Sequence, residues 1–215
     1  TGKTTVKTEL KTIDDKIADD PETQKVVKTW EQKVGRIIED MAYNADNEIL
    51  VTKTPLICTE ARIRSEPTNF GTLTARAFEK VIPDADAFLL NSGSMRLDDN
   101  LSGVITEYDI LRVYPYGGPI TRLEMSGETL DKVLTIGMET NWGEGGYFQT
   151  WKVKKSADGK WLINDKPVSK TKRYKIVMPE FLASGKEANL ELLGDLKREA
   201  FDAFTVDGKK VSNDV

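Results

Sequence analysis

Side chains that could carry out acid–base or metal chemistry are scarce in this chain of 215 residues, which contains no histidine and one cysteine. Without histidine, the chain cannot form the Ser-His or Cys-His pairs that activate a nucleophile. It also lacks the imidazole ligands of zinc sites and of mixed histidine–aspartate dimetal sites. Cys58 follows an apolar pair and is predicted to be a buried structural thiol. We therefore predict no catalytic residue and no metal ligand in this chain.

A second set of side chains could bind a ligand rather than transform it. Arg64 and Arg96 can form bidentate bonds to a phosphate or a carboxylate. Tyr116 and Phe181 follow proline breaks, and an aromatic ring on a loop offers a flat stacking face. Together with the amide of Asn91, these groups could form a pocket for a planar ring that bears an anion. Each of them alone is better explained as a surface charge or a packed aromatic, and spacing does not show that they converge.

Several other functions are disfavoured by the sequence. The Gly-Glu-Gly-Gly run at 143–146 lacks the Lys-Ser/Thr end of a Walker loop, and no Gly-x-Gly-x-x-Gly follows a strand. Lysine and arginine total 31 against 35 aspartates and glutamates, and the net charge of −4 argues against a nucleic-acid-binding face. No apolar stretch approaches the roughly 20 residues of a membrane-spanning helix.

A long amphipathic helix is the clearest predicted element. Asp20 suits the N-cap, because Pro21 favours the first helical position and Glu22 suits the first turn. The helix is predicted to run from about residue 21 to residue 42, after a loosely patterned strand or linker at 4–13. Its apolar residues recur at steps of three and four and form one stripe: Val26, Val27, Trp30, Val34, Ile37, Ile38 and Met41. Such a stripe is typical of a core helix, and also of a connector between two regions.

Strands and helices are interspersed after residue 48. Strands are predicted at 48–52, 87–90, 120–125, 147–153 and 173–178, with Pro55 ending the first and a hairpin turn at Asp158-Gly159. Helices are predicted from Thr68 or Asn69 to before Pro83, from 107 to 113, after Ser126, and near the end through Leu190, Leu193 and Leu196. This mixture predicts an α+β fold with mixed sheets and flanking helices.

Seven short segments between residues 60 and 190 follow one another in a specific order. They are RSEPTNFG at 64–71, NSGSMR at 91–96, GVIT at 103–106, PYGG at 115–118, SG at 126–127, GGYFQ at 145–149 and PEFLASG at 179–185. As an ordered set, they resemble the C-terminal domain of the 5′-nucleotidase and UDP-sugar hydrolase family. That resemblance implies an α/β/β/α layered fold for the matching part of the chain.

The family resemblance also implies an organisation into two domains. In such enzymes an N-terminal metallophosphoesterase domain holds two divalent metal ions, and the C-terminal domain binds the nucleoside part of the substrate. We expect residues 1–47 to be the tail of a missing N-terminal domain plus a connector helix, and residues 48–215 to be the substrate-binding domain. The implied partners are a nucleotide or nucleoside and the metallophosphoesterase domain of the same polypeptide. The implied location of the parent hydrolase is the periplasm or the cell surface.

The resemblance assigns substrate binding to particular residues. They are Arg64, Asn91, Gly93, Arg96, Tyr116, Gly118, Gly145, Phe181 and Glu187. Tyr116 and Phe181 correspond to two aromatics that sandwich the base, and the arginines correspond to groups that hold phosphate. Glu187 replaces an aspartate that holds the ribose hydroxyls, and Lys186 adds a charge before it, so the substrate could differ.

Two other functions remain open on sequence grounds. One is a related phosphoester or thioester hydrolase domain whose substrate is not a nucleotide. The other is a non-catalytic ligand-binding or protein-interaction module that works through the long helix. In each case we expect this chain by itself to be inactive as an enzyme and to hold no cofactor.

Overall fold

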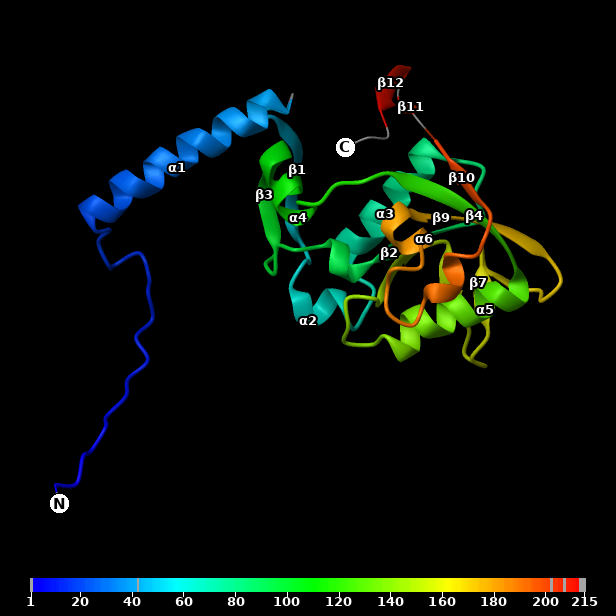
Figure 1. Cartoon of the computed structure of the whole chain (residues 1–215), viewed down its shortest axis with the longest axis horizontal. Helices are drawn as coiled ribbons and strands as arrows, with labels where there is room; N and C mark the ends of the chain where they lie inside the picture. Colours follow the sequence, from blue (N-terminus) through cyan, green and yellow to red (C-terminus); the bar gives the residue numbers. More distant parts are fainter. Residues whose placement is uncertain (1, 42, 202, 207, 213–215) are drawn as a thin grey trace. The chain divides into compact units, whose positions relative to one another are not determined.

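The computed structural model describes residues 2–41, 43–201, 203–206 and 208–212. The chain separates into two compact units, Thr1–Ala45 and Asp46–Val215, which are drawn in Figure 1. The predicted boundary between residues 47 and 48 lies close to this division. Whether the first unit belongs to a further domain stays a prediction.

The first unit contains one helix, α1 (Pro21–Asp40), after an exposed segment without helix or strand among the described residues. The side chain of Asp20 accepts a hydrogen bond from the backbone N–H of Thr23 at 2.8 Å, and Pro21 occupies the first turn. The predicted N-cap is therefore confirmed. Of the seven apolar residues in the predicted stripe, Ile38 is buried and the other six are exposed. The stripe therefore does not form a core within this unit.

The second unit holds the remaining elements. Its helices are α2 (Glu60–Ile63), α3 (Asn69–Val81), α4 (Glu107–Val113), α5 (Gly127–Thr135) and α6 (Glu180–Ala183), with single helical turns at Ser92–Ser94, Ile136–Thr140 and Glu191–Leu193. Its strands are β1 (Glu48–Leu56), β2 (Ala87–Asn91), β3 (Leu101–Thr106), β4 (Ile120–Ser126), β5 (Phe148–Trp151), β6 (Val153–Lys155), β7 (Trp161–Ile163), β8 (Lys166–Pro167), β9 (Arg173–Pro179), β10 (Arg198–Ala200), β11 (Ala203–Val206) and β12 (Lys209–Ser212).

A five-stranded sheet with the order β10-β4-β9-β2-β5 forms the centre of this unit. Strands β2 and β9 are parallel, and the other neighbouring pairs are antiparallel. Smaller sheets are formed by β1 with β3, by β6 with β7 and β8, and by β11 with β12. The predicted α+β class with mixed sheets and flanking helices is therefore confirmed.

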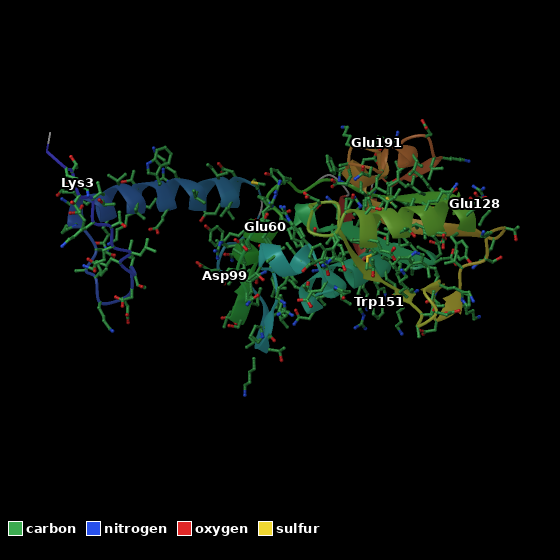
Figure 2. The ribbon with its side chains drawn as sticks, turned by 90° about the horizontal axis from the view of Figure 1, so that it is seen from below. Lys3, Glu60, Asp99, Glu128, Trp151 and Glu191 are labelled. Atoms are coloured by element: carbon green, nitrogen blue, oxygen red, sulfur yellow. The ribbon has the colours of Figure 1, made fainter. Side chains whose placement is uncertain are left out.

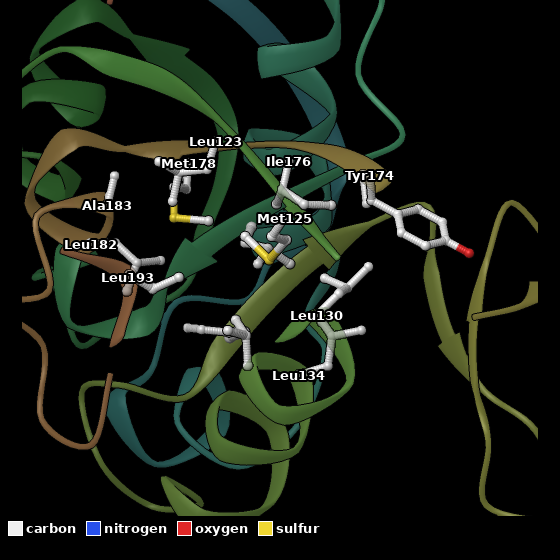
Figure 3. Packing of buried hydrophobic residues seen from close by; sticks show 14 of the residues in the cluster. Leu123, Met125, Leu130, Leu134, Tyr174, Ile176, Met178, Leu182, Ala183 and Leu193 are labelled. Atoms are coloured by element: carbon white, nitrogen blue, oxygen red, sulfur yellow. The ribbon is translucent and has the colours of Figure 1, made fainter. Parts of the chain in front are cut away.

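Helices cover both faces of the central sheet. Side chains of a strand alternate between the two faces, so neighbouring residues of one strand pack against different helices. In β2, Phe88 packs in a cluster with Ala75 of α3. Its neighbour Leu89 packs on the opposite face, in a cluster with Leu130 and Leu134 of α5. Figure 3 shows the cluster that contains Leu130 and Leu134, to which β4, β9 and α6 also contribute. The largest core thus lies between the sheet and α5 with α6.

A third cluster lies where β1, β3 and α4 meet the start of α3, and it contains Cys58. The thiol is fully buried beside Ile63 and Ile105. Burial raises the pKa of Cys58 to about 11, because a thiolate loses its hydration in apolar surroundings. The predicted structural thiol is therefore confirmed.

Two predicted strands differ from those in the structure. Strand β1 continues through Pro55 to Leu56. Among the described residues its partner is β3, and the register of that pair is irregular between Thr52 and Leu56. A proline is tolerated at such an edge, where its missing N–H leaves no ladder bond unmade. The strand predicted at 147–153 is divided into β5 and β6 by Lys152, whose φ of 65° is left-handed.

The helix predicted near the C-terminus is wrong. The leucines that suggested it lie around a single turn, Glu191–Leu193, and both Leu190 and Leu193 are fully buried in the core under α6. Their spacing reflects burial by the core rather than a helical repeat. The strands β3, β8, β10, β11 and β12 were not predicted, and each of them is six residues long or shorter.

A polar network at one edge of α3 predicts a pH dependence of stability. Glu79 accepts a hydrogen bond from the indole of Trp151 at 2.8 Å and forms an ion pair with Lys152 at 2.6 Å. Trp151 is labelled in Figure 2. The hydrogen bond from Lys152 is the main reason that the pKa of Glu79 lies below its usual value. As the pH falls, the carboxylate of Glu79 is therefore protonated in the unfolded chain before it is protonated in the folded chain. The stabilisation by this network is full above the ordinary pKa of about 4.5, and it is lost as the pH falls through the pKa of the folded state.

We expect Glu79→Gln to lower the free energy of unfolding by about 1 kcal/mol at pH 7 and by much less at pH 3. Urea unfolding of both proteins across this range measures the difference. The same change at Glu128, whose side chain is exposed beside Lys132, is the control and should cost less at every pH. A difference between wild type and Glu79→Gln that stays constant from pH 7 to pH 3 would contradict the assignment.

Candidate ligand-binding pocket

Strand pairing brings four loops to one edge of the central sheet. Strands β2 and β9 are parallel, so their carboxyl ends, Asn91 and Pro179, lie at the same edge. In the antiparallel pairs, Phe148 lies opposite Asn91 and Ile120 lies opposite Pro179. The loops after β2 and β9 and the loops before β4 and β5 therefore meet there. These loops carry most of the candidate residues.

A pocket of about 860 Å³ opens at this edge. Its walls include six of the nine predicted site residues, namely Asn91, Gly93, Arg96, Tyr116, Gly118 and Phe181. Further lining residues are Ser94, Tyr114, Gly117, Pro119, Pro179, Glu180, Ser184, Lys186 and Arg198. The structure thus brings these six together, while their role in binding a substrate stays a prediction.

Two exposed aromatic rings belong to the pocket wall. Tyr116 is 74% exposed and Phe181 is 51% exposed. The guanidinium of Arg96 lies 5.2 Å from the centre of the Tyr116 ring, within the range of a cation–π contact. The turn that presents Tyr116 needs the two glycines after it, because Gly117 and Gly118 have φ values of 55° and 105° that other residues rarely adopt. An aromatic face and a cation are therefore held side by side.

Helix α6 holds Phe181 against the loop that carries Tyr116. The backbone N–H of Glu180 donates to the carbonyl of Pro119 at 2.8 Å, which joins the start of α6 to that loop. The carboxylate of Glu180 forms an ion pair with Arg198 of β10 at 2.5 Å. Backbone and side chain of one residue thus tie the two aromatic walls of the pocket to each other and to the edge of the sheet.

Gly145 and Glu187 lie directly behind the lining residues. The backbone N–H of Gly93 donates to the carbonyl of Gly145 at 2.7 Å. Asn91, which is 3% exposed, donates through Nδ2 to Glu187 Oε2 at 3.0 Å and accepts from the hydroxyl of Ser94 at 2.8 Å. The amide of Asn91 is therefore engaged within the protein. These two predicted residues support the pocket from behind.

Arg64 lies in a different hollow of about 480 Å³, which it lines together with Glu60 and Trp142. Its guanidinium forms an ion pair with Glu60 at 2.8 Å, and its Nε atom is buried with no hydrogen-bond partner among the described residues. The carbonyl of Arg64 accepts from the N–H of Gly143 at 2.7 Å. The structure therefore does not place Arg64 on the wall of the main pocket beside Arg96.

Some lining residues were not found by sequence reasoning. Arg198 lies on a strand that was not predicted, and no local motif marks it. Glu180 belongs to the 179–185 segment but was considered only as part of that motif. Lys186 precedes Glu187, and its charge was the one feature of the sequence that pointed to a role in the pocket. Arg96 and Lys186 bring positive charge to the pocket wall, whereas the charge of Arg198 is paired with that of Glu180.

Metal ligands are not gathered in the described part of the chain. No cluster of three or more cysteine, aspartate or glutamate side chains suitable for a metal ion occurs among the described residues. Near the pocket, Glu180 is paired with Arg198 and Glu187 accepts from Asn91. These residues do not fit the two divalent ions that the family resemblance implies. Among the described residues, no helix is long and apolar enough to cross a membrane.

Comparison with known proteins identifies the family. Residues 48–192, about two thirds of the chain, match the family described as 5′-nucleotidase, C-terminal domain. The chain belongs to this family. The match covers strands β2, β4, β5 and β9 of the central sheet, the pocket loops and α6, whereas β10 lies beyond it. All the lining residues of the pocket except Arg198 therefore belong to the family domain.

Related proteins are much longer than this chain. Protein UshA of Yersinia enterocolitica is 29% identical over 173 residues, which is 79% of this chain and 30% of that protein. A 5′-nucleotidase of Vibrio cholerae is 31% identical over 127 residues, or 57% of this chain and 23% of that protein. The crystal structure of a 5′-nucleotidase precursor from Thermus thermophilus shares the fold, with a TM-score of 0.64 at 19% identity over 82% of this chain and 37% of that one. The chain thus spans about a third or less of these relatives.

A buried glutamine holds the segment that carries Arg64. Gln149 of β5 is fully buried, and its Oε1 accepts from the N–H of Thr68 at 2.8 Å. Its Nε2 donates to the carbonyls of Ile63 at 2.7 Å and of Glu66 at 2.8 Å. One side chain therefore satisfies three backbone groups of the segment between α2 and α3.

We expect Gln149→Met to lower the free energy of unfolding by roughly 2–3 kcal/mol, because it leaves these buried backbone groups without partners. Urea denaturation measures the loss. Gln24→Met on the exposed surface of α1 is the control and should change the stability by less than about 0.5 kcal/mol. Equal stability of the two variants would show that Gln149 does not hold this segment.

Proposed function

We propose that this chain is the substrate-recognition domain of a 5′-nucleotidase-type hydrolase, and that its pocket binds the nucleoside part of a nucleotide. The observation that carries the proposal is the pocket wall. Two exposed rings, Tyr116 and Phe181, and the guanidinium of Arg96 line one pocket of about 860 Å³. Membership of the 5′-nucleotidase C-terminal family supports a nucleotide as the ligand class.

The chemistry of a nucleotide matches these groups. A base has two apolar faces, and stacking on an aromatic side chain contributes about 1–3 kcal/mol per base. A phosphate carries negative charge, and an arginine holds it by charge-assisted hydrogen bonds. Arg96 lies beside the ring of Tyr116, so one ligand could stack on the ring and present its anion to the guanidinium.

The hydrolytic step itself is assigned to a domain outside this chain. In our proposal, a metallophosphoesterase domain of the parent protein supplies two divalent metal ions that activate water. The residues of this chain hold the base and the phosphate in position, which lowers the entropic cost of reaction. We propose the periplasm or the cell surface as the location of the parent protein, from the family resemblance alone. The chain by itself is expected to release no phosphate from AMP when divalent metal is added.

The stacking residues provide the first test of this proposal. We expect Tyr116→Ala and Phe181→Ala each to weaken binding of adenosine and AMP by roughly 5- to 150-fold, measured by calorimetry on the 215-residue chain at millimolar ligand. Tyr108→Ala is the matched control. Tyr108 is also an exposed tyrosine with an arginine near its ring, Arg112 at 5.9 Å, and it lies outside the pocket.

The arginine beside Tyr116 provides a second, independent test. We expect Arg96→Gln to weaken AMP by roughly 10-fold and adenosine by less than 2-fold, because only AMP carries the anion. Arg112→Gln should leave both affinities unchanged. If wild type, Tyr116→Ala, Phe181→Ala and Arg96→Gln bind AMP, UMP and adenosine with equal affinity, the nucleotide proposal fails. A hydrolase domain with another ester substrate or a binding module would then be the better explanation.

A further inference from the structure

Lys186 lines the pocket, but the function proposed above gives its positive charge no role. It is exposed, on the loop that follows α6. Within the described part of the chain, no carboxylate lies within ion-pair distance of its ammonium group, whereas Arg198 of the same pocket is paired with Glu180. Its positive charge is therefore available to a ligand.

The neighbouring carboxylate does not neutralise Lys186. Glu187 Oε2 accepts from Asn91 Nδ2 at 3.0 Å, and Glu187 Oε1 accepts from the N–H of Ala188 at 3.2 Å. Both oxygens are thus engaged behind the pocket wall, and Glu187 is not part of that wall. Of these two neighbours, Lys186 lines the pocket and Glu187 does not.

The loop that carries Lys186 is held on both sides. Gly185 has a φ of 72°, and a Cβ atom there would lie 2.7 Å from the carbonyl oxygen of Glu191. After Lys186, the buried Asn141 donates to the carbonyl of Ala188 at 3.1 Å and accepts from Asn189 Nδ2 at 2.8 Å. Because the backbone of this loop is fixed, the loop loses little conformational entropy when a ligand binds.

A second available cation comes from a different loop. Arg96 follows the turn after β2, and its guanidinium rests beside the ring of Tyr116 without an ion pair among the described residues. Lys186 follows the helix that carries Phe181. The pocket is thus lined by two cations from separate loops, one beside the ring of Tyr116 and one after the helix that carries Phe181.

We propose that Lys186 is a specificity-determining residue that binds a second anionic group, separate from the phosphate held by Arg96. The ligand class is an aromatic compound with two separated anions, such as a nucleoside that bears phosphates at two positions of its sugar. This inference rests on the proposed nucleotide pocket and adds a second anion contact to it.

The test compares adenosine, AMP and adenosine 3′,5′-bisphosphate by calorimetry on the 215-residue chain. We expect the wild type to bind the bisphosphate about 5-fold more tightly than AMP, the upper range for an exposed ion pair. Lys186→Gln should reduce that preference to less than 2-fold and leave AMP and adenosine affinities unchanged. Lys170→Gln removes the same charge outside the pocket and should preserve the preference.

Two results would overturn this inference and leave the nucleotide pocket intact. Lys186→Gln that weakens AMP and the bisphosphate equally would show that Lys186 and Arg96 hold the same phosphate. Lys186→Gln that behaves like Lys170→Gln towards the bisphosphate would show that Lys186 binds no ligand. Failure of the wild type to bind adenosine at all would instead refute the proposed function, and this inference with it.

Discussion

The parallel pairing of β2 with β9 is the constraint on which the candidate site depends. Every other neighbouring pair in the central sheet is antiparallel. Because β2 and β9 run in the same direction, Asn91 and Pro179 end at one edge, and the antiparallel partners begin there. A ligand pocket at the carboxyl ends of parallel strands is a common outcome of such topology. Here a single parallel pair is enough to gather four loops.

Polar side chains then hold these loops at fixed distances from one another. Asn141 and Asn91 are nearly fully buried, and each forms hydrogen bonds with residues of another loop. A buried amide without partners would cost free energy, so such groups specify one arrangement of the loops rather than a range of them. The aromatic wall of the pocket can therefore remain exposed without losing its geometry.

The pocket is suited to binding rather than to proton transfer. The carboxylates nearest to it are engaged by Arg198 and Asn91, and Arg96 and Lys186 remain available on its wall among the described residues. Aromatic faces and cations recognise a planar anionic ligand, and neither group accepts a proton at neutral pH. The chain belongs to a family of C-terminal domains, and its aligned part covers 30% of protein UshA and 23% of the Vibrio cholerae 5′-nucleotidase.

The sequence by itself determined the family, the fold class and the positions of most of the longer elements, because caps, prolines and apolar periodicity are local signals. Asp20, Thr68 and Ser126 each cap the helix that they were expected to cap. Only the tertiary structure decided which residues share the pocket. It left Arg64 in another hollow and added Arg198 from a short polar strand. Contacts such as that between Asn91 and Glu187 join positions 96 residues apart, and they follow from strand order and register, which no local pattern encodes.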